Sequence, residues 1–425
     1  MAVESQAVAR RNGLFTYENA LVVILGVTFG VVFFDRQAAS NLMTFIKPDL
    51  GMNETEVGAI GSALSATWAL SAYLVGLLSD KTGIRKMILI VCVVGFSICS
   101  IISGLASNFW ILIGSRFFMG LLEGGVMPIC LAIMVVESQE RRRGLNAGIV
   151  QNGFSNLIGN SLGPVALIAV AQASGWRNAF FLAAVPGLLC ALAIWLWVKE
   201  PAKDALHEGG GPPNMNLLAM LKVRNVLVCS LVSVFMVAWL VTGFAFLPLR
   251  LTDYRGYSPE TMKFIIGSLG FCAFLAGALL PGLSDRIGRK PVMIVGCFVS
   301  VLTSLAVLYV PGPLWLMVSF MFIGWVGNGI FPMFMGTIPG ESLPRAQIAT
   351  AMGIVVGIGE ILGGVCGPII AGWLSDTTSL GKEAPLFLMI ACALIAGVIA
   401  LFLKETAPAK LAATQADRVH QQKAA

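Results

Sequence analysis

The sequence is poor in charged residues. Only 12% of its 425 residues are Asp, Glu, Lys or Arg, about half of the roughly 25% that is typical of soluble domains. Hydrophobic residues account for 57% of the chain, and the mean hydropathy is +0.85. So few charges cannot cover a soluble globule, and the composition therefore excludes that class and indicates a protein that resides in a lipid bilayer.

Histidine and closely spaced cysteines are also scarce. The two histidines, His207 and His420, lie outside the apolar stretches, so an imidazole relay among those stretches is not expected. The nine cysteines lie within apolar stretches and form no close pairs, which argues against a disulfide framework and a zinc site. No nucleophile, base and acid stand out as a set. We therefore expect no catalytic site, no metal and no cofactor, and the chain is not predicted to be an enzyme.

Long apolar runs are abundant. Each is close to the roughly 20 residues that cross the hydrocarbon core of a bilayer as a helix, and far longer than a barrel strand. Twelve such runs occur, at residues 19–46, 57–78, 87–106, 109–136, 144–171, 178–199, 223–250, 261–283, 291–310, 313–338, 345–373 and 385–404. They predict an all-α membrane protein with twelve transmembrane helices.

Lysine and arginine are distributed unevenly between the two sides of these helices. If both termini lie on one side, 20 of these residues fall on that side and 6 on the other. The positive-inside rule then predicts a multi-pass protein of the cell (inner) membrane with both termini in the cytoplasm. Residues 1–19 show no cleavage site, so we expect this segment to be retained. Because the basic residues are scattered over short loops, no nucleic-acid partner is expected.

The second half of the chain repeats the first. The loop Gly76 to Lys86 returns as Gly282 to Lys290, with its aspartate 205 residues further on. The fifth and eleventh runs share a Gly-x-x-x-Gly-Pro pattern, at 159–164 and 363–368, at an offset of 204. Six spans per copy predict two pseudo-symmetric six-helix bundles with the same orientation, an arrangement suited to rocking about a central cleft.

The repeat also sets the domain boundaries. We expect an N-terminal six-helix bundle over residues 1–199 and a C-terminal six-helix bundle over 223–404. The polar segment 200–222 contains three consecutive glycines followed directly by two prolines and is predicted to be a cytoplasmic linker, and 405–425 a cytoplasmic tail. We expect the protein to be a monomer.

The repeated loop has a structural and a functional interpretation. At the least it is a tight turn that carries cytoplasmic positive charge. As a functional element, an acid beside an arginine at a helix end forms an ionic latch that holds helices in one state and releases them in another. The residues of this predicted conformational latch are Asp80, Arg85, Asp285 and Arg289.

The Gly-x-x-x-Asp-x-x-Gly-x-Arg-Lys loop, the twelve spans in two sixes and the central linker resemble the major facilitator superfamily of transporters. The loop pattern is complete in the first copy, whereas the second lacks one residue before Asp285 and one after Gly288. The resemblance covers nearly the whole chain and implies a secondary transporter.

Four ionisable residues lie deep in apolar runs of the first half, namely Asp35, Arg36, Arg116 and Glu123. Each costs at least about 2.5 kcal/mol if it faces lipid, so we expect all four to face the bundle interior. Asp35 and Arg36 are about 100° apart on their helix, so only one can point fully into a cleft. One interpretation is internal ion pairs that fix helix packing. The other is an arginine receptor for a carboxylate, with carboxyl groups beside it that carry protons.

These residues resemble the anion:cation symporter branch of the superfamily, which carries organic anions with protons. The resemblance implies that Arg36 binds the substrate carboxylate and that Asp35 and Glu123 are the protonatable pair, with Arg116 as counter-charge to one of them. Where that branch has Asn, Tyr and Asn, this chain has Ala38, Trp68 and Gly357, and these departures leave the substrate open. The proton-coupling set we predict is Asp35, Glu123, Arg116 and Glu360.

The remaining polar and aromatic residues of the spans leave several roles open. Glu360 is either a further proton site or a residue that hydrogen-bonds across the bundle. Amides either bind substrate or hold helices together. Besides Arg36, the predicted substrate-binding residues are Trp68, Gln151, Asn152 and Asn328, and further candidates for the pocket wall are Phe154, Trp239, Phe244 and Trp325.

Together these features predict a transporter that imports a small organic anion by proton symport with alternating access. Tyrosine is scarce in the spans, which favours a small aromatic carboxylate over a polyhydroxylated sugar acid, although a sugar-acid symporter is an alternative. A proton-coupled exporter of a metabolite or drug is a second alternative. Its typical glycine pattern begins at Gly159 but ends on Leu167 and Ile168, where glycines would be expected.

Overall fold

The structure is a computed structural model that describes residues 16–139, 142–200, 220–344, 347–407 and 410. Within these residues, twelve helical segments are long and apolar enough to cross a membrane, which confirms the predicted all-α, twelve-span fold. The spans are Tyr17–Leu50, Glu54–Ser79, Arg85–Gly104, Phe109–Met134, Asn146–Ser174, Trp176–Trp197, Arg224–Tyr254, Pro259–Ile287, Arg289–Tyr309, Leu314–Glu341, Thr350–Thr377 and Gly381–Ala400.

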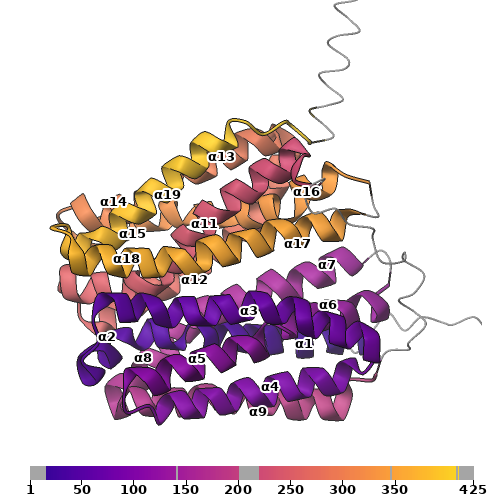
Figure 1. Ribbon diagram of the computed structural model, residues 1–425, viewed down its shortest axis with the longest axis horizontal. Coiled ribbons are helices and arrows are strands. Elements are labelled where there is room, and N and C mark those ends of the chain that lie inside the picture. Colours follow the sequence, from indigo (N-terminus) through magenta and orange to yellow (C-terminus); the bar gives the residue numbers. More distant parts are fainter. Residues whose placement is uncertain (1–15, 140–141, 201–219, 345–346, 408–409, 411–425) are drawn as a thin grey trace, which may run out of the picture.

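Helices from the first half of the chain form one bundle (Figure 1). They are α1 (Tyr17–Arg36), α2 (Ala38–Leu50), α3 (Glu54–Thr82), α4 (Arg85–Gly104), α5 (Phe109–Glu123), α6 (Val126–Glu137), α7 (Arg143–Gly148), the π-helical η1 (Ile149–Gly153) and η2 (Ser155–Leu162), α8 (Gly163–Ser174) and α9 (Trp176–Trp197). Most of the predicted linker, most of the predicted tail and both histidines lie outside the described residues.

Helices from the second half form a bundle that lies alongside the first in Figure 1. They are α11 (Arg224–Leu249), η4 (Arg250–Tyr254), α12 (Pro259–Ile287), α13 (Arg289–Val299), α14 (Val301–Tyr309), α15 (Leu314–Trp325), η5 (Val326–Ile330), η6 (Met333–Thr337), α16 (Ile338–Glu341), α17 (Ile348–Ile358), η8 (Gly359–Val365), α18 (Cys366–Thr377), η9 (Gly381–Glu383) and α19 (Ala384–Ala400). The domain boundaries drawn from the sequence stay predictions.

Each bundle is packed around its own apolar core. One cluster of buried residues runs from Leu21 to Val198 and belongs entirely to the first bundle. Another belongs to the second bundle apart from Ile168. A third cluster is mixed, because Phe246 and Leu249 of α11 pack among residues of the first bundle. The two bundles thus have largely separate cores, which meet at Ile168 and in the mixed cluster.

The repeated loops have the same local structure. Gly83, which follows α3, has φ +69°, and Gly288, which follows α12, has φ +109°. L-residues rarely adopt such angles, so the glycines allow the chain to reverse between helices. Beyond each loop, a carboxylate caps the next helix: Glu200 accepts the first two backbone N–H groups of α4, and Glu405 those of α13. The duplication therefore extends to the capping acids, which are again 205 residues apart.

The environment of Glu405 shows how strong this cap is. Burial raises the pKa of Glu405, but backbone N–H groups of Ala407, Arg289, Lys290 and Thr406 donate to its carboxylate and hold the pKa below its ordinary value. A carboxyl group with a lowered pKa in the folded state contributes stability above its ordinary pKa. That contribution is lost as the pH falls through the lowered value, because the neutral acid accepts these bonds less well.

Helical irregularities coincide with the repeated glycine pattern. The π-helical segments η2 and η8 begin at Ser155 and Gly359, which are 204 residues apart and lie in the fifth and eleventh spans. The glycines in them allow close packing, since a Cβ on Gly363 would lie 2.1 Å from the Val234 carbonyl oxygen. Segments of π-helix are frequent at functional sites, and η8 carries Glu360.

Candidate functional site

Arg36 lies at the interface between the bundles. It is the last residue of α1, and its side chain is 11% exposed. Its guanidinium lies 4.9 Å from the ring centroid of Trp68 and donates a 3.5 Å hydrogen bond to Ser65 Oγ, both on α3. Across the interface, Arg36 Nη2 is 3.8 Å from Glu360 Oε2 on η8. A stacked guanidinium with free edges can grip a carboxylate with two parallel bonds.

Asp35 points in a different direction from Arg36, as their adjacent positions predict. Its side chain is fully buried in the first bundle, where Oδ1 accepts a 2.5 Å hydrogen bond from Ser100 of α4. Oδ2 has no hydrogen-bond partner among the described residues. Asp35 is therefore a carboxyl group inside the bundle rather than a substrate ligand in the cleft.

Arg116, the predicted counter-charge to Asp35 or Glu123, is also fully buried and lies beside Asp35 without a direct ion pair. Its guanidinium donates to the backbone carbonyl of Asp35 at 3.3 Å and to Ser103 Oγ at 2.7 Å, and it lies over the Phe180 ring. Within the described residues, no carboxylate oxygen approaches it to 4.0 Å. Its positive charge is thus placed beside Asp35, and its hydrogen bonds among the described residues go to neutral groups, while Nε has no partner there.

Glu123, at the end of α5, has the least compensated carboxyl group. It is fully buried, and neither oxygen has a hydrogen-bond partner among the described residues. A charge in such a place is costly unless it is paired. A proton that neutralises the group removes this cost, and Glu123 is therefore suited to a role that involves proton binding.

The structure also contains a cavity between the bundles, lined by residues of both. Residues not predicted from the sequence supply its polar lining, and these are Gln37, Asn41 and Asn160. Phe244 and Trp325, which were predicted to line the pocket, form its aromatic side and lie 6.0 Å apart. The position of Gln37 and Asn41 could have been inferred from the sequence only because they follow Arg36 on the same span. Amides in membrane spans show no distinctive pattern that would mark them as pocket residues.

The other predicted substrate ligands are not brought to Arg36. Gln151 donates to Met127, and the backbone carbonyl of Asn152 accepts a bond from Asn156, both within the first bundle. Asn328 lies in η5 of the second bundle, and its Nδ2 has no hydrogen-bond partner among the described residues. Of the predicted set, only Trp68 and Glu360 contact Arg36.

Glycines on two helices show where the bundles meet. A Cβ on Gly58 of α3 would lie 2.1 Å from the Pro368 carbonyl oxygen, and one on Gly270 of α12 would lie 1.9 Å from that of Asn160. Gly76 and Gly277 lie on the same faces, 18 and 7 residues further along, and a Cβ on either would meet nothing within 4 Å. The bundles therefore touch on the side away from the termini and separate toward the side of the termini.

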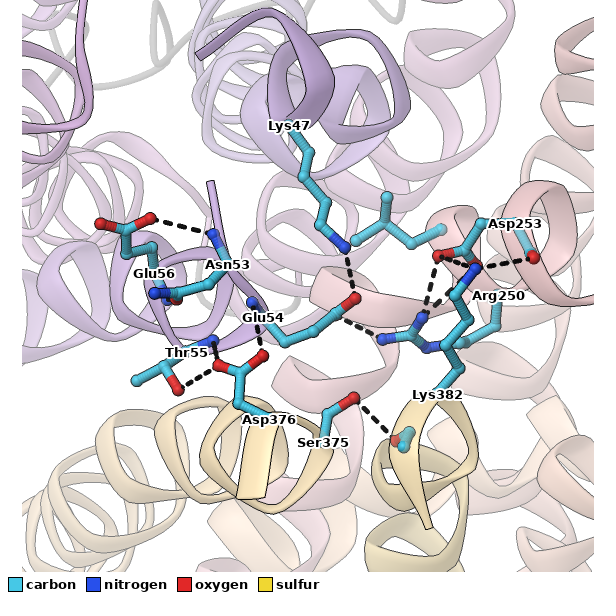
Figure 2. A network of polar contacts seen from close by, with 12 residues as sticks. Lys47, Asn53, Glu54, Thr55, Glu56, Arg250, Asp253, Ser375, Asp376 and Lys382 are labelled. Atoms are coloured by element: carbon cyan, nitrogen blue, oxygen red, sulfur yellow. Dashed lines mark hydrogen bonds and ion pairs between the residues drawn. The ribbon is translucent and has the colours of Figure 1, made fainter. Parts of the chain in front are cut away.

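A polar network seals the side on which the bundles touch (Figure 2). Asp376 of α18 accepts hydrogen bonds from the backbone N–H groups of Glu54 and Thr55, at 3.1 and 2.7 Å, and so caps α3 of the opposite bundle. The Glu54 carboxylate in turn bonds Arg250 at 2.5 Å and also pairs with Lys47. Hydrogen bonds and ion pairs between charged groups thus connect the two bundles on this side.

Arg250 is the main polar residue that sequence reasoning missed. It was counted only as a loop charge, but its side chain is fully buried. Besides Glu54, it pairs with Asp253 at 3.0 Å, three residues along η4. An arginine at the end of an apolar run looks like an ordinary membrane-boundary charge, so nothing in the local sequence distinguishes it.

We expect the substitution Asp376→Asn to open this seal more often. An amide loses one of the two charge-assisted acceptors, each worth about 1.5–3 kcal/mol, so the open population should rise by about tenfold to a hundredfold. The measurement is the labelling rate of Asn41→Cys by a membrane-impermeant maleimide from the side opposite the termini, corrected for the native cysteines. Asn41 is buried in the present structure, so labelling reports opening.

The matched control is Asp49→Asn. Asp49 lies on the same side of the protein, but its carboxylate bonds Arg177 and Trp176 of its own bundle. We expect its labelling rate to equal that of Asn41→Cys alone. Equal rates in all three proteins would show that Asp376 does not hold the bundles together.

The predicted latch is formed in part. Arg289 pairs with Asp285 at 2.5 Å and with Glu341 of α16 at 2.8 Å, and all three belong to the second bundle. The first copy is less defined, because the side chain of Asp80 lies outside the described part of the structure, and Arg85 is buried. Its role as a conformational latch stays a prediction.

Two similar helical bundles around a buried charged site define a membrane transporter. Over residues 25–355 and 227–425 the sequence matches the family described as the Major Facilitator Superfamily, and the chain belongs to this family. Family and relatives are transporters rather than enzymes. Among the described residues no group of His, Cys, Asp and Glu is placed to hold a metal ion.

Curated relatives include carriers of organic anions. The chain is 27% identical to a "Probable 4-methylmuconolactone transporter" of Cupriavidus pinatubonensis, over 85% of this chain and 84% of the relative. It is 24% identical to the "Sialic acid transporter NanX" of Escherichia coli, over 83% and 86%. A "Multidrug resistance protein MdtG" of Escherichia coli is 27% identical over 72% and 74%. The resemblance to organic-anion transporters of this superfamily is thereby confirmed.

Solved structures show the same fold. A bacterial homologue of the human lysosomal transporter Spinster, in an inward-facing and unoccupied conformation, superimposes with a TM-score of 0.73. It is 18% identical and covers 92% of this chain and 97% of its own. At this identity the likeness concerns the fold alone.

Proposed function

We propose that this transporter carries a small organic anion, in symport with protons, by alternating access between the two bundles. The observation that carries the proposal is Arg36, a nearly buried arginine that stacks on Trp68 and lies 3.8 Å from Glu360 of the opposite bundle. A carboxylate is the anion that matches an arginine's two parallel donors. Relatives described as carriers of methylmuconolactone and sialic acid support this class.

Within this proposal, protons bind at Asp35 and Glu123. Both carboxyl groups are fully buried in the first bundle, and three of their four oxygens have no hydrogen-bond partner among the described residues. Arg116 contributes positive charge beside Asp35 without neutralising either group directly. A proton that arrives with the substrate lets the bundle close around a neutral interior, which is the cheaper state in a low dielectric.

The protein's setting follows from the same proposal. We place it as a monomer in the inner membrane, with both termini in the cytoplasm, so that the side sealed by Asp376 faces outward. The loop residues Asp80, Arg85, Asp285 and Arg289 would form the complementary latch on the cytoplasmic side. Substrate contacts by Gln151, Asn152 and Asn328 would require a conformation that brings them nearer Arg36.

Two alternatives are kept because an observation favours each. A sugar acid suits the amides Gln37, Asn41 and Asn160, which can bind hydroxyl groups, whereas a small aromatic acid suits Phe244 and Trp325. Export is favoured by the similarity to a protein described as a multidrug resistance protein. A symporter and an exporter respond to a proton gradient in opposite directions.

The proposed function is tested in proteoliposomes. A thermal-shift screen of the purified protein with benzoate, 4-hydroxybenzoate, phenylacetate and gluconate first finds a carboxylate that binds. With an inward proton gradient, symport of that compound leads to accumulation, whereas antiport leads to depletion. Binding of none of these carboxylates, or transport that ignores the gradient, would contradict the proposal.

A further inference from the structure

One ion pair connects the substrate arginine to the opposite bundle. Arg36 belongs to the first bundle and Glu360 to the second, 324 residues later in the chain. Their side chains are 11% and 12% exposed, and the closest nitrogen and oxygen are 3.8 Å apart. This distance is long for a hydrogen bond, so the two groups attract each other without being locked together.

Arg36 is the only charge that faces Glu360 in the described part of the chain. The elements packed against η8 are α3, α11, α17 and α18. Their charged residues all lie within three positions of a helix end, and they are Glu54, Glu56, Asp80, Lys81, Arg224 and Asp376. Near Glu360 these elements supply Ser65 and Val237, while Asp35 turns away toward Ser100. Glu360 Oε2 has no hydrogen-bond partner among the described residues.

This isolation makes the charge of Glu360 depend on Arg36. A buried carboxylate is tolerated when a cation compensates it, and breaking such a pair is strongly unfavourable because a charge is left unpaired. If a substrate carboxylate takes the guanidinium of Arg36, then Arg36, Glu360 and the substrate together carry two negative charges and one positive charge. Neutrality is restored when one proton, delivered by water from the side on which the bundles separate, binds to Glu360.

We propose that Glu360 is the exchangeable counter-ion of Arg36: the substrate carboxylate displaces it, and Glu360 takes up one proton as it leaves. The inference rests on the proposed function and deepens it, because it assigns one proton to the binding step itself. The pair crosses the interface, so substrate binding also removes an attraction that joins the bundles. The empty and the loaded protein therefore have the same site charge.

The same arrangement selects the class of substrate. One cation is available, and the displaced carboxyl group stays in the site opposite it. A second carboxylate on the substrate would lie in a region without a further cation and would have to be desolvated unpaired. The site therefore favours monocarboxylates over dicarboxylates of similar size.

Proton uptake on binding tests the inference directly. Calorimetric titration of the purified protein with whichever screened monocarboxylate binds, in two buffers of different ionisation enthalpy, gives the number of protons taken up per anion. We expect Glu360→Gln to take up about one proton fewer per bound anion than the unmodified protein. The Kd of the unmodified protein should change about tenfold per pH unit because of this proton, and the Kd of Glu360→Gln should lack that change. Glu360→Asp should retain both properties, because it keeps a carboxyl group.

Glu260→Gln is the matched control. Glu260 is an exposed acid of α12 that pairs with Lys263, and its replacement should leave proton uptake unchanged. Binding that requires Arg36 but shows the same proton uptake in Glu360→Gln as in the unmodified protein would overturn the counter-ion role alone. If no screened carboxylate binds, or if binding persists in Arg36→Ala, the proposed function fails, and the inference fails with it.

Discussion

Replacing Arg36 by alanine should abolish substrate binding and exchange. Truncation of one partner of a buried charge pair costs about 2–5 kcal/mol, which corresponds to a loss of affinity of about thirtyfold to several thousandfold. The affinity of Arg36→Lys should lie between those of the unmodified protein and Arg36→Ala, because an ammonium keeps the charge but loses the planar fork and the stacking on Trp68. The measurements are calorimetric titration and tracer exchange in proteoliposomes.

Arg36→Ala also leaves Glu360 without its cation, so the variant needs a control for folding. The double variant Arg36→Ala with Glu360→Gln removes both charges and should regain stability without regaining binding. Arg177→Ala provides a control for the loss of an arginine elsewhere, since Arg177 pairs with Asp49 and is 43% exposed. If the double variant binds substrate with the affinity of the unmodified protein, Arg36 is not a substrate ligand.

Replacing Glu123 by glutamine should uncouple transport from the proton gradient. An amide is uncharged at every pH and has nearly the same volume, so the bundles should still rearrange around substrate. Exchange of labelled for unlabelled substrate should therefore continue. A gradient of one pH unit can drive at most about tenfold accumulation per coupled proton. If Glu123 carries one of the transported protons, accumulation in Glu123→Gln should therefore be about tenfold lower.

The two assays need to be made on the same vesicles. Glu260→Gln again serves as the control, because it is an acid-to-amide change at an exposed position. Should Glu123→Gln vesicles still concentrate substrate as far as the unmodified protein does, Glu123 carries no transported proton. Loss of exchange together with accumulation would instead point to a structural role for Glu123 within the first bundle.

The number of spans could be predicted from composition and run length, but their ends could not. The first apolar run stops at residue 46, whereas the helical span continues to Leu50. Lys47 and Asp49 extend it because their charged ends find partners, Lys47 with Glu54 and Asp49 with Arg177. Polar residues near a membrane boundary can continue a helix whenever such partners are near, and run length carries no information about them.

The candidate site was predicted where a local rule applies. The divergence of Asp35 and Arg36 follows from 100° per residue, and the structure directs one into the first bundle and the other across the interface. Arg116 was predicted as the counter-charge to Asp35 or Glu123, and it lies beside Asp35, but its hydrogen bonds go to a backbone carbonyl and a serine. Helical periodicity indicates which face a side chain occupies, but it does not indicate what lies opposite.

The sequence by itself determined that this is a duplicated twelve-span membrane protein with four ionisable residues deep in the apolar runs of its first half. These are local properties, because hydrophobic run length, glycine turns and helical period depend on nearby residues. Only the tertiary structure decided that Arg36 meets Glu360, that Asp376 caps α3, and that Arg250 is buried in the seal. These contacts join residues about 200 to more than 300 positions apart, and they depend on which helix faces pack when two bundles meet.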